Sequence, residues 1–142
     1  MLIRELSAIW WRAPREVAAF LLWGWGMSRY LKGRYKGARR AIDHLRKWSP
    51  QGADDLLSRL VMGISCLETG DRVTAKGELA AAFRLYSGGL ETPRGWERDM
   101  ARALDEYALL LDGDSEHHER QAVESAAGHI HSLLCEKDCG SR

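Results

Sequence analysis

The chain has 142 residues, 45% of them hydrophobic, which is the size of a single domain with a packed core. Its formal net charge is only +1, yet residues 1–50 carry 11 Lys and Arg against 3 Asp and Glu, while residues 51–142 carry 10 against 17. This asymmetry lets the two halves, or two copies of the chain, attract each other, or it gives the first half an affinity for an anionic partner.

The cysteines and the N-terminal residues argue against a secreted or membrane-spanning protein. The three cysteines (Cys66, Cys135 and Cys139) are an odd and small number, which argues against a disulfide framework and fits a reducing compartment. Charged residues between Arg4 and Glu16 interrupt the apolar positions that a signal peptide would need. The longest apolar run, from Val17 to Met27, is too short to span a bilayer. We therefore expect a cytoplasmic protein.

The first half of the chain predicts helices and no strands, because Ala, Leu, Arg and Glu are frequent and no period-2 run stands out. Three helices are expected, at residues 2–11, 14–31 and 35–48. Pro14 suits the first position of a helix, so it is expected to end one helix and begin the next. Gly33 lies in the following turn, and Pro50 disfavours helix in the residue before it.

The second half predicts four more helices, at about residues 54–68, 71–86, 93–112 and 115–135. Gly70 and Gly113 mark the turns within two of the hairpins. Thr92 followed by Pro93 is typical of an N-cap and a first helical residue. Residues 137–142 are expected to form a frayed tail.

Five positions recur 37 residues apart, which indicates an internal repeat. The pairs are Gly26 and Gly63, Gly33 and Gly70, Ala38 and Ala75, Ile42 and Leu79, and Leu45 and Ala82. Small residues at such positions allow the two helices of a hairpin to approach closely. The repeat predicts three helix–turn–helix pairs that stack into one core, preceded by a short leading helix.

In these residues the chain resembles the tetratricopeptide repeat family, over roughly residues 15–135. The resemblance implies an all-α fold of three antiparallel helix–turn–helix pairs forming a superhelix, within a single domain over residues 1–142. Its parts would be an N-terminal helix (1–13), repeat 1 (14–50), repeat 2 (51–90), a degenerate repeat 3 or capping helix (91–136) and a flexible tail (137–142). The loop around Ser87–Pro93 is roughly six residues longer than the repeat would give.

The resemblance further implies a concave groove lined by the first helix of each pair. Carried over to this chain, the groove residues are Phe20, Trp23, Met27, Tyr30, Leu31, Leu57, Leu60, Ile64, Leu67, Met100, Ala103, Tyr107 and Leu110. Such an apolar and aromatic groove would receive an apolar peptide or an amphipathic helix of a partner protein. The alternatives are that residues 2–11 fill the groove, or that these side chains are simply core.

A basic patch follows the first predicted hairpin turn. It comprises Arg29, Lys32, Arg34, Lys36, Arg39 and Arg40, with Arg46 and Lys47 beyond it. A nucleic-acid backbone or an anionic membrane would bind such a patch. We favour a solvated helix face, or docking against an acidic neighbour, because overall charge is near neutral and no nucleic-acid motif is present. The tryptophans at 10, 11, 23 and 25 likewise suit core packing or a protein partner better than a membrane surface.

The residues with the most reactive side chains lie near the C-terminus. His131, Cys135 and Cys139 are four residues apart, so one helix face would carry imidazole and thiolate donors suited to zinc or copper(I). A single helix face rarely closes a tetrahedral site, so metal binding is the weaker hypothesis and no cofactor is expected.

No motif for catalysis stands out, and we expect no enzyme. The leading hypothesis is a protein–protein interaction adaptor or small chaperone whose groove binds an apolar segment of a partner. The first alternative is a structural subunit of a homo- or hetero-oligomeric assembly that uses its basic front half, with a salt-sensitive interface. The second is a metal-binding protein that uses the C-terminal His and Cys residues.

Overall fold

A computed structural model describes the backbone of residues 2–49 and 54–140, and the side chains of residues 14–49 and 54–140. Within these ranges all regular secondary structure is helical, with no strand. The helices are α1 (Leu2–Leu31), α2 (Tyr35–Trp48), α3 (Leu56–Glu68), α4 (Arg72–Ser87), α5 (Glu97–Leu110), the short 3-10 helix η1 (Asp114–Glu116) and α6 (His117–Gly140). The all-α prediction is confirmed.

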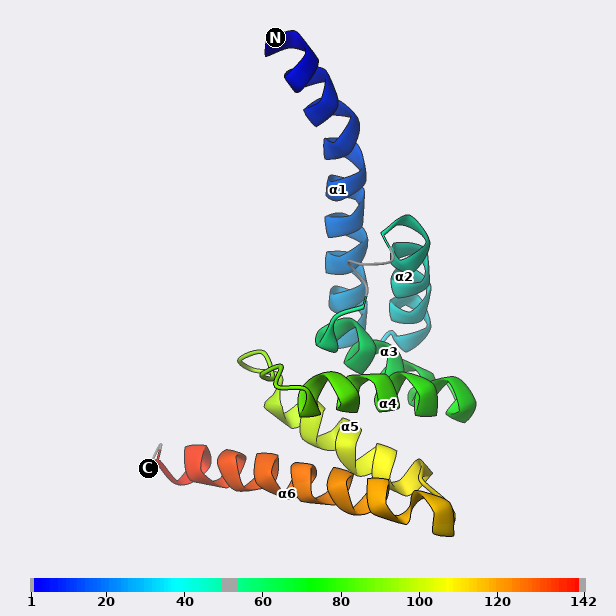
Figure 1. The fold of residues 1–142 in the computed structure, drawn as a ribbon, viewed down its shortest axis with the longest axis vertical. Helices are drawn as coiled ribbons and strands as arrows, with labels where there is room; N and C mark the ends of the chain where they lie inside the picture. The colour runs from blue at the N-terminus through cyan, green and yellow to red at the C-terminus, as the bar shows by residue number, and fades with distance from the viewer. Residues whose placement is uncertain (1, 50–53, 141–142) are drawn as a thin grey trace.

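Consecutive helices pack as three hairpins, formed by α1 with α2, α3 with α4, and α5 with α6. The hairpins stack in chain order through contacts of α2 with α3 and of α4 with α5. Figure 1 shows α1 standing beside α2, with its N-terminal end directed away from the other two hairpins. The predicted set of helix–turn–helix pairs is therefore confirmed, and the second hairpin lies between the other two.

The turns of the first two hairpins have the same backbone geometry. Gly33 and Gly70 both have positive φ, 72° and 84°, which glycine adopts without the steric cost of a Cβ. In each turn the glycine N–H donates to the carbonyl three residues earlier, and the next N–H donates to the carbonyl five residues earlier. This is the Schellman arrangement that satisfies the last carbonyls of a helix. The 37-residue offset is thus a structural as well as a sequence relation.

The same offset relates the close approach of the helices within each hairpin. A Cβ built on Gly63 would lie 2.6 Å from Cδ2 of Leu79, and one built on Gly26 would lie 3.3 Å from Cδ1 of Ile42. Gly26 and Ile42 precede Gly63 and Leu79 by 37 residues each. Each glycine therefore makes room for one large apolar side chain of the second helix.

The core is centred on α3, which contacts α1, α2, α4 and α5. The largest fully buried side chains of the core come from all three hairpins: Ile42, Leu45, Leu60, Val61, Ile64, Cys66, Leu79, Met100, Leu104, Tyr107, Leu111 and Val123. Burial of such side chains is the main favourable contribution to folding. Because α3 is covered on several sides, it carries apolar residues around most of its circumference.

One expected helix boundary is wrong. The sequence predicts separate helices at residues 2–11 and 14–31, but α1 is continuous from Leu2 to Leu31 with Pro14 inside it. A proline removes one backbone hydrogen bond and crowds the preceding turn, which a helix tolerates when its remaining bonds are kept. The predicted short N-terminal helix is therefore the first part of α1.

Two boundaries in the third hairpin also differ from expectation. The helix expected from Pro93 begins only at Glu97, because residues 93–96 form a turn in which the N–H of Trp96 donates to the carbonyl of Pro93 over 3.0 Å. At the C-terminus, α6 continues to Gly140 through most of the expected flexible tail. Lys137 on its last turns lies 2.8 Å from Glu97, which holds this part of α6 against α5. Residues 141–142 lie outside the described residues.

Candidate partner-binding surfaces

Most residues of the expected groove lie in the core. Met27 and Tyr30 on α1, Leu57, Leu60 and Ile64 on α3, and Met100, Ala103 and Tyr107 on α5 are all buried. Trp23, Leu67 and Leu110 are partly buried against them. Because α3 has neighbouring helices on several sides, its apolar stripe packs between the hairpins. Of the expected groove residues, Phe20 and Leu31 are the ones that stay largely exposed.

Tyr30 shows how an expected groove residue joins two hairpins. Its hydroxyl donates a 2.6 Å hydrogen bond to Oδ1 of Asp99, at the start of α5. Its ring stacks on Trp96 at 5.7 Å and meets Tyr35 edge-on at 5.9 Å between ring centroids. Burial and the neighbouring Asp99 carboxylate raise the Tyr30 pKa, so the phenol stays protonated. Tyr30 is therefore a structural link between the first and third hairpins.

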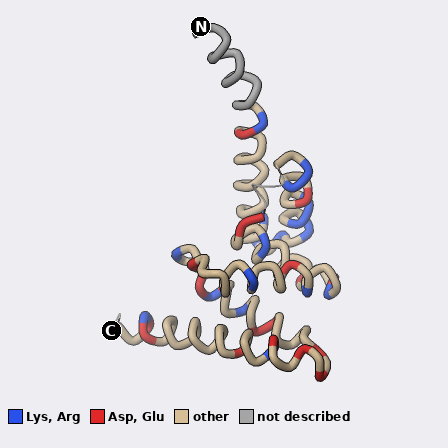
Figure 2. Tube along the Cα trace, viewed as in Figure 1, with Lys and Arg blue, Asp and Glu red and all other residues tan. Residues whose placement is uncertain are grey.

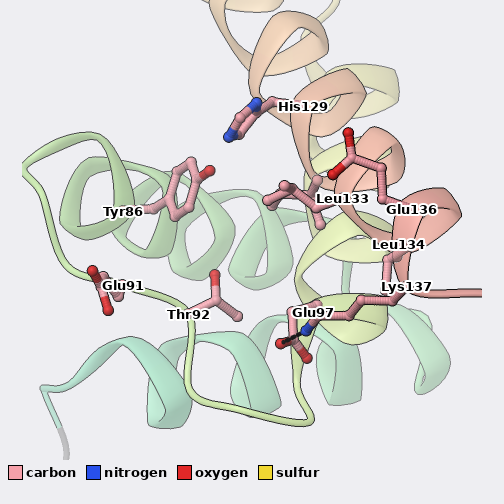
Figure 3. A pocket seen from close by; sticks show the side chains of 10 residues that line it. Tyr86, Glu91, Thr92, Glu97, His129, Leu133, Leu134, Glu136 and Lys137 are labelled. Atoms are coloured by element: carbon pink, nitrogen blue, oxygen red, sulfur yellow. Dashed lines mark hydrogen bonds and ion pairs between the residues drawn. The ribbon is translucent and has the colours of Figure 1, made fainter. Parts of the chain in front are cut away.

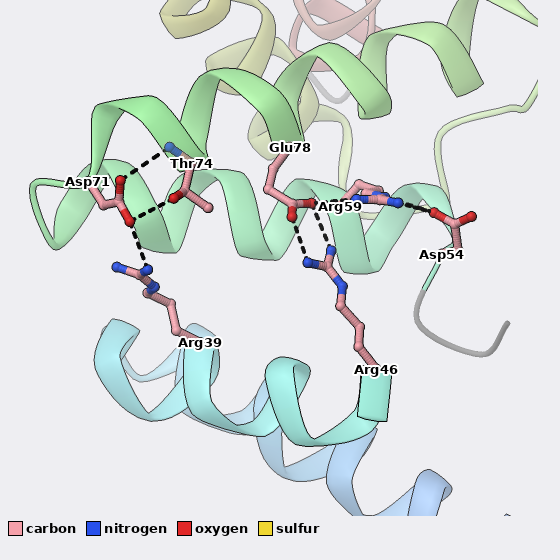
Figure 4. Close-up of polar contacts among 7 residues, drawn as sticks. All are labelled: Arg39, Arg46, Asp54, Arg59, Asp71, Thr74 and Glu78. Atoms are coloured by element: carbon pink, nitrogen blue, oxygen red, sulfur yellow. Dashed lines mark hydrogen bonds and ion pairs between the residues drawn. The ribbon is translucent and has the colours of Figure 1, made fainter. Parts of the chain in front are cut away.

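Part of the basic stretch also has a structural role, shown in Figure 4. Arg46 of α2 makes two hydrogen bonds to Glu78 of α4, at 2.6 and 2.7 Å, and Arg59 of α3 adds a third at 3.1 Å. Arg39 donates to Thr69 and to Asp71 at the turn of the second hairpin, at 2.8 and 3.0 Å. These contacts hold the basic first hairpin against acidic residues of the second.

The Glu78 carboxylate is nearly buried yet charged. Burial by itself raises its pKa, but the hydrogen bonds and positive charges of Arg46 and Arg59 outweigh that effect and lower it. Bidentate pairing of a carboxylate with arginine is the geometry that best compensates loss of solvent. Glu78 therefore acts as an ionic link among α2, α3 and α4.

The remaining basic residues lie at the surface. Lys32, Arg34, Lys36 and Arg40 are exposed, and the Arg29 guanidinium sits 5.1 Å from the centre of the Trp25 ring. A shallow depression of about 410 Å³ lies among residues of this turn, including Arg29, Arg34 and Lys36. The surface is basic, and Figure 2 shows its contrast with the acidic turn between α5 and α6.

The candidate metal ligands do not gather into a site. His131 lies with its Nε2 2.8 Å from Oδ2 of Asp105, while Cys135 and Cys139 are exposed free thiols further along α6. Among the residues whose positions are described, no three His, Cys, Asp or Glu side chains come together in a way that could hold a metal ion. The helical spacing of the three residues is present, and the second helix α5 brings Asp105 to His131 without completing a set of three ligands among the described residues.

A cleft in the third hairpin was not predicted from the sequence. It has a volume of about 600 Å³ and lies between the end of α4, the loop over residues 88–96 and the C-terminal half of α6 (Figure 3). The lining residues are Tyr86, Glu91, Thr92, Glu97, His129, Ile130, Leu133, Leu134, Glu136 and Lys137. The signal in the sequence was the loop around Ser87–Pro93, which is longer than the repeat requires and forms one wall.

The cleft combines an apolar wall with an acidic rim. Ile130, Leu133 and Leu134 form the apolar wall from α6, while Glu91 and Glu136 are exposed at its edge. Glu97 also lines the cleft, where it accepts a 2.8 Å hydrogen bond from Lys137. This contact holds the pKa of Glu97 below its usual range. A ligand with an apolar body and positive charges matches this arrangement.

A second unpartnered surface runs along α1, opposite the side that packs on α2. Phe20 is 71% exposed, Leu21 64% and Leu31 71%, with Val17 and Trp25 beside them about half exposed. These positions follow helical spacing on one face, whereas Leu22, Gly26 and Tyr30 face the core. We call Val17, Phe20, Leu21, Trp25 and Leu31 the outer α1 face.

Comparisons with known proteins assign the chain to no family. No protein-family model matches it, and no match was found among curated proteins or among solved structures. Membership of the tetratricopeptide repeat family stays a prediction. Over the described residues, no helix has both the length and the apolar character needed to cross a membrane.

Proposed function

We propose that this chain is a cytoplasmic, non-enzymatic adaptor or chaperone that binds a basic amphipathic segment of a partner protein in the α4–α6 cleft. The observation that carries the proposal is the coincidence of an apolar wall and an acidic rim in one cleft of about 600 Å³. Clefts of this size accommodate a compact ligand or a few anchoring side chains of a peptide.

The chemistry of the cleft selects the kind of segment. Apolar side chains of the ligand would displace water from Leu133 and Leu134, which supplies the favourable burial term. Lysine or arginine side chains of the ligand would face Glu91 and Glu136, which favours a basic segment over an acidic one. A helical ligand presents both kinds of side chain on separate faces, as in other helix-in-groove complexes.

A synthetic helical peptide with leucine on one face and arginine on the other tests the proposal. We expect the labelled peptide to bind the full chain by fluorescence anisotropy, and Leu133→Asp to weaken binding at least about tenfold by placing a charge in the apolar wall. The matched control is Leu109→Asp, because Leu109 is an exposed leucine of α5 outside the cleft. This control is expected to bind like the unchanged protein.

Two results would contradict the proposal. One is equal affinity of the Leu133→Asp variant and the unchanged protein for the leucine–arginine peptide. The other is binding of a matched peptide with glutamate in place of arginine that is as tight as binding of the original, since the acidic rim should repel it.

A further inference from the structure

Gly24 has no structural explanation within the chain. It lies inside α1, where glycine is less favourable than alanine by about 1 kcal/mol. A Cβ built on Gly24 would meet nothing within 4 Å, so no packing contact requires its absence. Gly26, two residues later, gives the contrast, because it faces α2 and a Cβ there would lie 3.2 Å from the Cβ of Ala41.

The residues on this side of α1 are complementary in size about Gly24. Val17 and Leu31 lie seven residues before and after it. The large Phe20 lies four residues before Gly24, and the small Ser28 four residues after. An antiparallel copy of this helix crossing at Gly24 would bring Val17 of each chain toward Leu31 of the other. It would likewise bring the large Phe20 of each chain toward the small Ser28 of the other.

We propose that the outer α1 face binds a second copy of this chain, as an antiparallel helix pair whose two-fold axis passes near Gly24. A two-fold interface joins the same patch on both chains, which requires a patch that is complementary to itself. Small residues where two helices cross allow their backbones to approach closely. Gly24 and Ser28 would allow such an approach to α1 of the partner, as Gly26 allows it to α2 of the same chain. This interface is independent of the cleft.

The exposed area on this face approaches the area that a stable dimer buries on each chain. If a large side chain has about 150–250 Å² to bury, the exposed fractions of Val17, Phe20, Leu21, Trp25 and Leu31 amount to about 600 Å² on each chain. A stable complex buries about 800 Å² per partner, and monomeric proteins rarely leave contiguous apolar patches beyond a few hundred Å². In the sequence, the three-and-four spacing continues toward the N-terminus at Ala13, Trp10, Leu6 and Ile3.

Charge also favours an antiparallel arrangement. The N-terminal end of α1 points away from α3 to α6 (Figure 1), so an antiparallel copy directs its own N-terminal end toward the half of the molecule that holds those helices. The half of α1 before Gly24 carries Arg4, Arg12 and Arg15 against Glu5 and Glu16, a net charge of +1, whereas residues 51–142 carry 10 basic against 17 acidic residues, so the two approaching parts have opposite net charge.

Gly24→Ala gives opposite effects on the dimer and on the monomer. By sedimentation equilibrium we expect it to weaken self-association roughly tenfold or more, because two methyl groups would occupy the helix crossing. At a concentration where both proteins are monomers, it should raise the unfolding temperature by about 2–4 °C, since alanine favours helix and no clash arises. Gly128→Ala is the matched control, because Gly128 is an open glycine of α6 and its substitution should leave association unchanged.

Cysteine cross-linking tests the direction of the helices. In a background with Cys135→Ser and Cys139→Ser, chains with Val17→Cys are mixed with chains with Leu31→Cys and oxidised. An antiparallel pair gives the mixed cross-link between positions 17 and 31 as the main product. Predominant 17–17 and 31–31 products would overturn the arrangement.

Three further outcomes would overturn the proposal itself. The first is that the unchanged protein remains a monomer at high micromolar concentration and low salt. The second is that Gly24→Ala associates as tightly as the unchanged protein. The third is a monomer that binds anionic lipid vesicles and loses this binding with Phe20→Glu, which would make a membrane surface the occupant of the outer α1 face. Val73→Asp removes an 87%-exposed apolar residue on α4 and should change none of these readouts.

Discussion

Glu78 is the residue on which the contact between the first two hairpins depends most. It accepts hydrogen bonds from Arg46 of α2 and Arg59 of α3, and Arg59 also pairs with Asp54. A charged group with so little solvent exposure is stable only while these partners remain. Removing its charge leaves two guanidinium groups next to a neutral amide.

We expect Glu78→Gln to lower the free energy of unfolding by about 2 kcal/mol at pH 7, because charge-assisted hydrogen bonds are lost at a nearly buried position. Urea unfolding followed by circular dichroism measures this change. Glu124→Gln, which removes the exposed pair of Glu124 with Arg120 on α6, is the control and should cost less than about 0.5 kcal/mol. Equal effects of the two substitutions would contradict the assigned role of Glu78.

The difference in stability between the unchanged protein and the Glu78→Gln variant should depend on pH. The pKa of Glu78 is lowered in the folded chain, so the folded state binds protons less readily than the unfolded state. The stabilisation is therefore complete above the ordinary glutamate pKa of 4.5 and is lost as pH falls through the lowered value. Urea unfolding near pH 3 should show a smaller difference between the two proteins than unfolding at pH 7.

At the scale of the helices, packing requires a glycine at positions 26 and 63, whereas Gly77 has open space around it. We expect Gly63→Ala to destabilise the chain by about 1–3 kcal/mol, because its Cβ would lie 2.6 Å from a side-chain atom of the fully buried Leu79. Gly77→Ala in the neighbouring helix α4 has open space and should stabilise by about 0.5–1 kcal/mol. Thermal or urea unfolding of both variants should show changes in the free energy of unfolding with opposite signs.

Helices and turns could be predicted from the sequence because their signals are local. Gly33 and Gly70 mark turns through their backbone freedom, and residues 35–48 are bounded by such signals on both sides. Pro14 gave a local signal for a helix start that the remaining hydrogen bonds of α1 override. Thr92 and Pro93 gave a similar signal, which the turn before Glu97 overrides.

The binding surfaces could not be predicted in the same way, because helical spacing shows that a helix has an apolar face but not what covers it. Ile64 and Phe20 satisfy the same spacing rule, yet Ile64 is fully buried and Phe20 is largely exposed. The cleft also depends on how the loop before Glu97 lies relative to α6, and the residues that meet there are more than thirty positions apart in the sequence. The unusual length of that loop was its one local sign.

In the molecule as a whole, the two proposed surfaces lie on different hairpins. The outer α1 face belongs to the first hairpin, whereas the cleft is formed mainly by the third with the end of α4. The second hairpin packs against both of these hairpins and is joined to the first by Arg39 and Arg46, and Tyr30 of the first hairpin also bonds directly to Asp99 of the third. A dimer formed through α1 would contain two copies of the cleft.

Hydrogen–deuterium exchange in the presence of the leucine–arginine peptide tests the central claim most directly, since it locates the bound ligand on the chain. At saturating peptide we expect slower exchange in residues 86–97 and 129–137, which line the cleft, and unchanged exchange in residues 14–31 of α1. Protection confined to α1, or no protection of the cleft segments while the peptide is bound, would contradict the proposed function.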